Sequence, residues 1–172
     1  MLVAGALLTM GADMPPNHKL RCELRGNENA TDISFSAQRP EHLHFILFSH
    51  EDGLKVYAEW NSWGYAARSF TATDAQSKAY NISRRARGWS RNAPTTQTIA
   101  KGDFLMTDIY LCDGTWRVEP KLPAGPVKLK VIGHFQNSPG ADAKRAGVWT
   151  GEIQSPPVEV SLEKECVERL NG

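Results

Sequence analysis

The sequence predicts an all-β fold, an antiparallel β-sandwich of about 8–10 strands. Short runs of alternating apolar and polar residues recur along the chain, with Gly, Pro, Asn and Asp between them. Almost no stretch repeats its apolar residues with the period of a helix. The chain has 172 residues, 41% of them hydrophobic, which is enough for one domain with its own core.

The predicted sandwich domain spans residues 18–163, and residues 1–17 are expected to lie outside it. The apolar run at residues 2–10 resembles the hydrophobic region of a signal peptide, although no basic residue precedes it. We interpret it as a truncated signal peptide, and a disordered or edge-packed N-terminus is the alternative. The run is too short to span a bilayer, so no transmembrane segment is expected. A signal peptide would place the protein in the periplasm, in the cell envelope or outside the cell.

The first half of the domain contains six predicted strands, at residues 20–24, 33–37, 42–49, 54–60, 65–73 and 79–83. The run HLHFILFS at residues 42–49 is the most apolar in the body of the chain, so we expect a central strand there. Asp52-Gly53 predicts a hairpin turn into the strand at residues 54–60. Trp60 continues the apolar face of that strand and is expected in the core.

The segment WNSWGY at residues 60–65 is interpreted as a tight connection in the middle of the sandwich. Trp63 and Tyr65 have two interpretations. They either pack in the core or the turn, or they form an aromatic platform on which a sugar ring stacks. We include both in the predicted ligand-binding set.

The second half continues the strand pattern, with predicted strands at residues 104–111, 127–133, 148–154 and 158–162 and a short segment at residues 116–119. Residues 84–96 show no period and form the longest predicted loop. Residues 137–146 are predicted to be a polar loop. The C-terminal residues 164–172 are either a short amphipathic helix or a frayed tail.

The sequence WTGEIQSPPVEV at residues 149–160 follows a strand that begins after Leu122-Pro123-Ala124-Gly125. These residues resemble the last strands of immunoglobulin-like modules in bacterial secreted and cell-envelope proteins. The resemblance is best over residues 122–162 and rests on strand pattern elsewhere. It implies an immunoglobulin-like sandwich in an exported protein. It implies no catalytic residues, because such modules mostly bind or space other domains, and a fold does not establish a function.

Charge and cysteine spacing exclude two classes of protein. Lys and Arg number 20 and Asp and Glu 19, so a net charge of +1 gives no general attraction to nucleic acid. Cys22, Cys112 and Cys166 are too far apart in sequence for a cysteine zinc cluster. An exported protein is expected to form one disulfide and leave one thiol. All three pairings are open, and we prefer Cys22 with Cys166, because the first and last strands of sandwiches often lie side by side.

Four arginines surround a tryptophan in the longest predicted loop: Arg84, Arg85, Arg87 and Arg91 around Trp89. Guanidinium groups bind phosphate, sulfate and carboxylate, and an indole ring stacks on a base or a sugar. These residues are the main part of the predicted ligand-binding set. The alternative is a solvated loop whose arginines pair with nearby acids.

His42 and His44 are two residues apart on a predicted strand and therefore share a face, as in zinc and copper sites on sheets. His50 would lie about 20 Å beyond His44 at roughly 3.3 Å per residue, so it is not expected to join them. No carboxylate or cysteine stands at an evident further position. Solvent-facing or hydrogen-bonded histidines are the alternative, and no cofactor is otherwise expected.

No complete catalytic motif occurs: the chain contains no Gly-x-Ser-x-Gly, no His-Glu-x-x-His and no phosphate-binding glycine loop. Our first hypothesis is therefore a non-enzymatic, extracytoplasmic binding module that contacts a protein or glycan partner through one end of the sandwich. One alternative is a copper or zinc protein that uses His42 and His44. Another is a proteinase-inhibitor-like domain that acts through an exposed loop such as residues 137–146.

Overall fold

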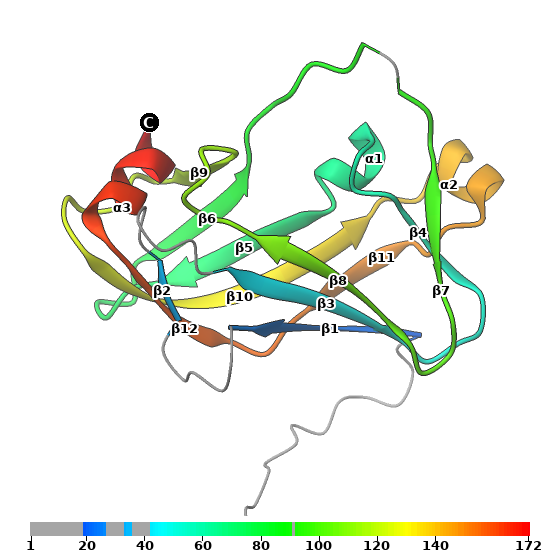
Figure 1. Ribbon diagram of the computed structural model, residues 1–172, viewed down its shortest axis with the longest axis horizontal. Coiled ribbons are helices and arrows are strands. Elements are labelled where there is room, and N and C mark those ends of the chain that lie inside the picture. Colours follow the sequence, from blue (N-terminus) through cyan, green and yellow to red (C-terminus); the bar gives the residue numbers. More distant parts are fainter. Residues whose placement is uncertain (1–18, 27–32, 36–41, 91) are drawn as a thin grey trace, which may run out of the picture.

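A computed structural model describes residues 19–26, 33–35, 42–90 and 92–172. In this part of the chain there are twelve strands and three short helices (Figure 1). The predicted all-β class is confirmed at this level. The strands are short and numerous because the chain is punctuated by turn residues, among them Gly53, Gly102 and Gly114, which all have positive φ.

The strands form three sheets. The first is three-stranded and has the order β1 (Leu20–Arg25), β3 (Leu43–Ser49) and β8 (Phe104–Ile109). The second has the order β2 (Ile33–Phe35), β12 (Val158–Leu162), β10 (Val127–Asn137), β5 (Arg68–Thr73), β6 (Ala79–Arg84) and β9 (Trp116–Glu119), and β11 (Gly151–Gln154) pairs with β10. The third pairs β4 (Leu54–Tyr57) with β7 (Thr96–Ile99).

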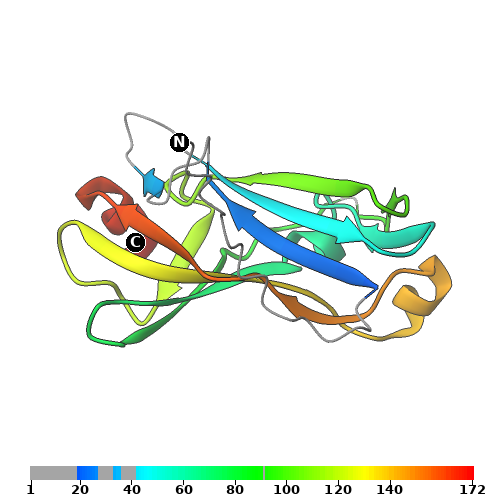
Figure 2. The same ribbon diagram turned by 90° about the horizontal axis from the view of Figure 1, so that it is seen from below.

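The three-stranded sheet packs over the larger sheet, and Figure 2 shows the two layers edge on. In the core between them, the ring centroid of Phe45 lies 6.2 Å from that of Phe70 and 6.5 Å from that of Phe135. A Cβ atom on Gly133 would lie 2.8 Å from the Phe45 ring and 3.1 Å from Leu24. Glycine at this position therefore allows the two layers to approach so closely.

The core also contains a charged side chain, Arg68 of β5, which is 2% exposed. Its guanidinium carbon lies 5.6 Å from the ring centroid of Phe45 and 5.4 Å from that of Phe135. Its Nε and Nη1 atoms have no hydrogen-bond partner among the described residues. Burial lowers the pKa of Arg68 to about 10, so the side chain is still protonated at neutral pH. The faces of the Phe45 and Phe135 rings thus provide favourable contacts for this charge.

The strand ladders differ from the prediction in two places. All are antiparallel except that between β2 and β12, which is parallel. The Asp52-Gly53 turn is present, with φ of 66° at Gly53, but the predicted hairpin between residues 42–49 and 54–60 is wrong. β3 pairs with β1 on one side and β8 on the other, so β4 has no free edge to join and pairs with β7.

The WNSWGY segment contains helix α1 (Ser62–Tyr65) rather than a plain turn. The side chain of Asn61 caps it by accepting a hydrogen bond of 2.9 Å from the Gly64 amide. A Cβ atom on Gly64 would lie 2.1 Å from the carbonyl oxygen of Ala58, which explains the glycine. The predicted burial of Trp60 is wrong, because β4 ends before it and its side chain is 65% exposed.

Two more helices lie in the second half. Residues 137–146, predicted as a polar loop, contain helix α2 (Ala141–Ala146), which ends at Gly147 in the left-handed conformation. The C-terminal alternatives resolve as helix α3 (Lys164–Asn171), with Cys166, Val167 and Leu170 buried. No helix among the described residues is long and apolar enough to cross a bilayer.

The disulfide joins Cys112 to Cys166, so the preferred pairing of Cys22 with Cys166 is wrong. The C-terminal strand β12 lies between β2 and β10, and no ladder joins it to β1. Helix α3 instead packs near β9 and the loop after β8, where Cys112 lies. Cys22 is a buried free thiol in the core, and burial raises its pKa to about 12.

Candidate functional site

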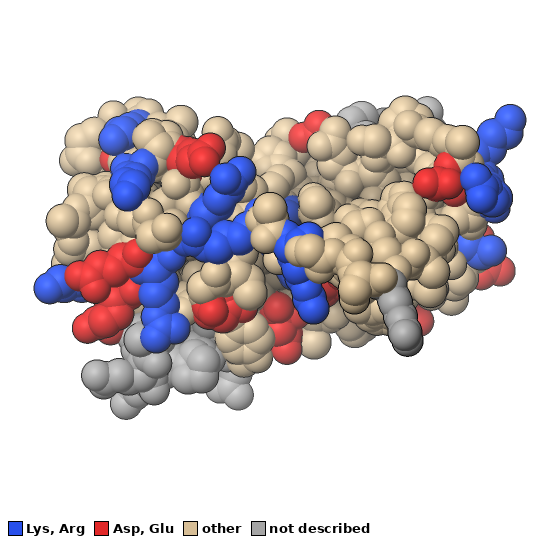
Figure 3. Space-filling view, turned by 90° about the horizontal axis from the view of Figure 1, so that it is seen from above, with Lys and Arg blue, Asp and Glu red and all other residues tan. Residues whose placement is uncertain are grey.

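The predicted arginine site lies in the connection between β6 and β7, at the top of Figure 1. Figure 3 looks onto this face from above and shows a band of Lys and Arg side chains across its middle. Arg84, at the end of β6, pairs with Glu59. Its guanidinium carbon also lies 4.7 Å from the ring centroid of Tyr65 and 5.0 Å from that of Trp116. Burial lowers the pKa of Arg84, whose charge is thus engaged within the protein.

Arg85 is also held by its own chain. Its Nε donates to the carbonyl oxygen of Trp116 at 3.1 Å, and its Nη2 donates to that of Arg169 at 2.9 Å. Arg169 in turn donates from Nη1 to the carbonyl oxygen of Cys112 at 2.9 Å. These bonds tie helix α3 to the loop that carries the disulfide. Arg85 therefore supports the fold at this end of the molecule.

The other predicted residues separate into two groups. Arg87 is exposed, and its guanidinium carbon lies 5.2 Å from the ring centroid of Trp89. The ring centroids of Trp89 and Tyr65 are 5.4 Å apart. Trp63 instead packs against Tyr57, with ring centroids 6.1 Å apart. Trp63 also lines a cavity of about 400 Å³ beside α2. Arg91 lies outside the described residues, so the structure groups Arg87, Trp89 and Tyr65 and places Trp63 elsewhere.

A second surface was not predicted: the solvent side of the three-stranded sheet, which we call the outer face. The antiparallel registers of β1, β3 and β8 align its side chains in rows, because residues directly opposite each other share a face. The three rows are Arg25, His44 and Asp108; Glu23, Ile46 and Met106; and Arg21, Phe48 and Phe104.

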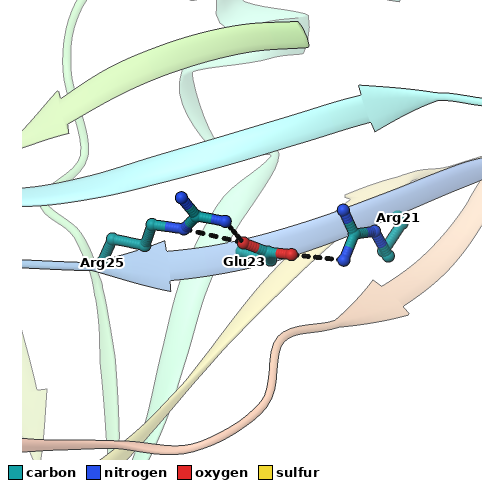
Figure 4. Close-up of polar contacts among 3 residues, drawn as sticks. All are labelled: Arg21, Glu23 and Arg25. Carbon is teal, nitrogen blue, oxygen red and sulfur yellow. Dashed lines mark hydrogen bonds and ion pairs between the residues drawn. The ribbon is translucent and has the colours of Figure 1, made fainter. Parts of the chain in front are cut away.

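The β1 side of the outer face carries three charged residues that neutralise one another in part. Figure 4 shows Glu23 between Arg21 and Arg25, with which it forms two ion pairs. The Nε atom of Arg25 donates to Glu23 at 2.8 Å. The guanidinium carbon of Arg21 lies 4.4 Å from the ring centroid of Phe48. This side is therefore a polar border next to an apolar centre.

The β8 side of the outer face exposes large apolar side chains. Phe104 is 53% exposed, Met106 48% and Tyr110 37%. β8 is also the last strand of its sheet among the described residues, so the backbone groups on its far edge have no strand partner there. Exposed apolar residues on a sheet edge favour association with another chain. One feature of the sequence indicates this surface: Phe104, Leu105 and Met106 are apolar in succession, so both faces of the strand carry apolar side chains there.

One end of the outer face brings together two imidazoles and a carboxylate. His44 Nδ1 lies 2.7 Å from Asp108 Oδ1, and the His42 and His44 ring centroids are 5.0 Å apart. One ligand atom from each of His42, His44 and Asp108 lies within 4.8 Å of the other two. The ring of Tyr110 packs 5.0 Å from that of His42. Asp108 was not recognised in the sequence, because the β3–β8 pairing joins residues that are 64 positions apart.

Comparisons with known proteins find no match to this chain among protein-family models, curated proteins or solved structures. The geometry of the two surfaces is therefore the basis for a functional assignment.

Proposed function

We propose that this chain is a non-enzymatic, extracytoplasmic binding module with an immunoglobulin-like fold, and that it contacts a protein partner through the outer face. Strand order supports the immunoglobulin-like assignment. β3 and β8 are neighbours in one sheet, as strands B and E are in immunoglobulin domains. β5, β10 and β12 are neighbours in the other sheet, as strands C, F and G are.

The disulfide between Cys112 and Cys166 supports the extracytoplasmic assignment. Disulfides persist mainly in oxidising compartments, because the cytosol keeps most thiols reduced. The reading of residues 1–17 as a truncated signal peptide agrees with this location. Those residues lie outside the described part of the chain.

The observation that carries the proposal is a set of three exposed apolar side chains, Phe104 and Met106 on β8 and Tyr110 directly after it, which we call the apolar row. Aromatic residues and Met are enriched at the centre of protein interfaces, and polar groups surround them. Arg21, Glu23 and Arg25 provide such a border on the β1 side. The outer edge of β8, which has no strand partner within the described ranges, adds backbone donors and acceptors with which an extended segment of a partner pairs. These features favour a protein over a glycan.

The stack of Arg87, Trp89 and Tyr65 supports a second candidate, which is contact with a glycan or an anionic ligand. An exposed guanidinium group beside a half-exposed indole ring is suited to either. This candidate uses a different part of the molecule, so variants of each surface show which of the two makes a given contact.

The test uses three forms of the purified chain as bait for envelope and secreted proteins from its source cells. They are the native chain, a β8 variant with Phe104→Thr and Met106→Thr, and a loop variant with Arg87→Ala and Trp89→Ala. We expect a partner that the native chain and the loop variant retain and the β8 variant loses. The affinity for the recombinant partner should then fall at least about 10-fold in the β8 variant, as hot-spot residues require.

Two outcomes would contradict the proposal. If the loop variant loses the partner while the β8 variant keeps it, contact occurs through Arg87 and Trp89. If the native chain alone forms a concentration-dependent dimer that the β8 variant does not form, the outer face binds a second copy of this chain.

A further inference from the structure

His42, His44 and Asp108 meet at one end of the outer face. What this cluster can bind is set by the donor atoms of the three residues and does not depend on the proposed partner. His42 and His44 are half-buried on and beside β3, and Asp108 is exposed on the neighbouring strand β8. The register places Asp108 directly opposite His44, so the sheet itself fixes the backbone of two of the three residues.

The distances suit a single small cation. The three donor atoms lie within 4.8 Å of one another. A tetrahedral ion with bonds of about 2.0–2.2 Å holds its ligand atoms roughly 3.4 Å apart. His44 Nδ1 and Asp108 Oδ1 are 2.7 Å apart, which is closer than this value. The side chains would have to rotate to reach the required spacing, and an ion would replace the hydrogen bond between His44 and Asp108.

The chemistry of the donors selects the metal. Two imidazoles and one carboxylate match the preferences of Zn²⁺ and Cu²⁺, whereas Mg²⁺ and Ca²⁺ prefer sets composed of oxygen atoms. With three protein ligands on a solvent-facing surface, a fourth position stays open to water or to a ligand from another molecule. Packing of Tyr110 against His42 restricts one imidazole and so reduces the entropy lost on binding.

Two other histidines provide a contrast. His134 contacts Thr71 Oγ1 at 2.8 Å and Glu152 at 3.3 Å, and His50 is exposed at the opposite end of β3. Among the described residues, neither belongs to a group of three metal-binding side chains. His50 therefore serves as a matched control: its removal deletes one imidazole from the chain without touching the cluster.

We propose that His42, His44 and Asp108 together bind one divalent late transition metal ion, Cu²⁺ or Zn²⁺, with all three as direct ligands. The site lies at the tip of the edge strand, beside the apolar row of the outer face. A metal ion there would link β3 to β8 and leave one position available to a further ligand. The ion is thus proposed as a constituent of a binding surface, and no reaction is assigned to it.

The experiment is a titration of the full purified chain, prepared without chelators, with CuCl₂, ZnCl₂ and MgCl₂ against a chromophoric competitor. We expect one equivalent of Cu²⁺ or Zn²⁺ and no competition by Mg²⁺. His42→Ala, His44→Ala and Asp108→Ala should each weaken binding by at least about 10–100-fold, the loss typical of altering a metal site. His50→Ala should bind as the native chain does.

Two further measurements separate a ligand role from a structural one. Electron paramagnetic resonance of the Cu²⁺ form should show coupling to two imidazole nitrogens in the native chain and to one in either single histidine variant. Asp108→Asn keeps an acceptor for His44 but is a poor metal ligand, so it should bind as weakly as Asp108→Ala. Circular dichroism confirms that each variant is folded.

The proposal would be overturned by full binding in a His42→Ala, His44→Ala double variant, which would place the ion elsewhere in the chain. Equal weakening by His50→Ala would also overturn it, because the effect would then not be specific to the cluster. Native affinity in Asp108→Asn would remove Asp108 as a direct ligand and so contradict the proposed coordination.

Discussion

The connection between β6 and β7 and the outer face contain similar residue types, namely arginines beside aromatic rings, but use them differently. At the start of the connection, Arg84 as the last residue of β6 pairs with Glu59, and Arg85 donates to backbone carbonyl groups of its own chain. On the outer face, Phe104 and Met106 point to solvent from an edge strand. Residue type alone therefore does not identify a binding surface, because the same groups also hold the fold together.

If the end of the molecule that carries Arg84 and Arg85 is structural, removal of its disulfide should have a large effect on stability. Cys112 and Cys166 are separated by 54 positions, and closing a loop of this length is worth up to about 4 kcal/mol. We expect Cys112→Ser with Cys166→Ser to lower the free energy of unfolding by about 2–4 kcal/mol. Urea denaturation followed by circular dichroism measures this change.

The thiol content provides the control for this experiment. The native chain has one free thiol, Cys22, which is buried and has a pKa raised to about 12 by burial. It should react with a thiol reagent only after unfolding, because little thiolate forms near neutral pH. A fast-reacting native thiol, or a double variant as stable as the native chain, would contradict the assigned disulfide.

Several elements were predictable because their cause is local. The strands β3, β5 and β6 follow from the spacing of apolar residues near each other in sequence, and the helical alternative for residues 164–172 has the same local cause. Helix α2 was missed, although ADAKRA contains good helix formers, because its polarity was taken as a sign of a loop. Trp60 was misplaced because its alternation was extended past the end of β4.

The candidate site was predictable only in part, for a different reason. His42 and His44 share a face through local geometry, so their pairing was visible in the sequence. The third donor, Asp108, reaches them only through the register of β3 with β8. The number of ways to pair strands is large, and register depends on which faces are buried in the complete fold. Arg85 shows the same dependence, because its partner Arg169 is 84 positions away.

A smaller effect should distinguish two arginines of the same connection. Arg84 pairs with Glu59 and lies over two aromatic rings, whereas Arg87 is exposed. We expect Arg84→Ala to lower the free energy of unfolding by about 2 kcal/mol, less than for a fully buried pair because the pair keeps some exposure to solvent. Arg87→Ala should change it by less than about 0.5 kcal/mol.

A double-mutant cycle with Glu59→Ala measures how much of the Arg84 effect comes from the ion pair. The remainder comes from contacts with Tyr65 and Trp116. If Arg84→Ala and Arg87→Ala changed the free energy of unfolding equally, Arg84 would be no more structural than Arg87. The connection between β6 and β7 would then again be a candidate for the main binding surface.

The smallest change in stability is expected on the outer face, and it is the most informative. Phe104→Thr with Met106→Thr should alter the free energy of unfolding by less than about 0.5 kcal/mol, because both side chains are about half exposed and Thr suits a strand. Ile109→Ala, on the buried side of the same strand, should lower it by about 2–4 kcal/mol. Thermal and urea unfolding of the three proteins test this pair of expectations.

If the outer variant is destabilised as much as Ile109→Ala, the exposed apolar row belongs to the core of this fold. If it is as stable as the native chain, the row is dispensable for folding, and a loss of partner binding in the same variant reports on contact alone.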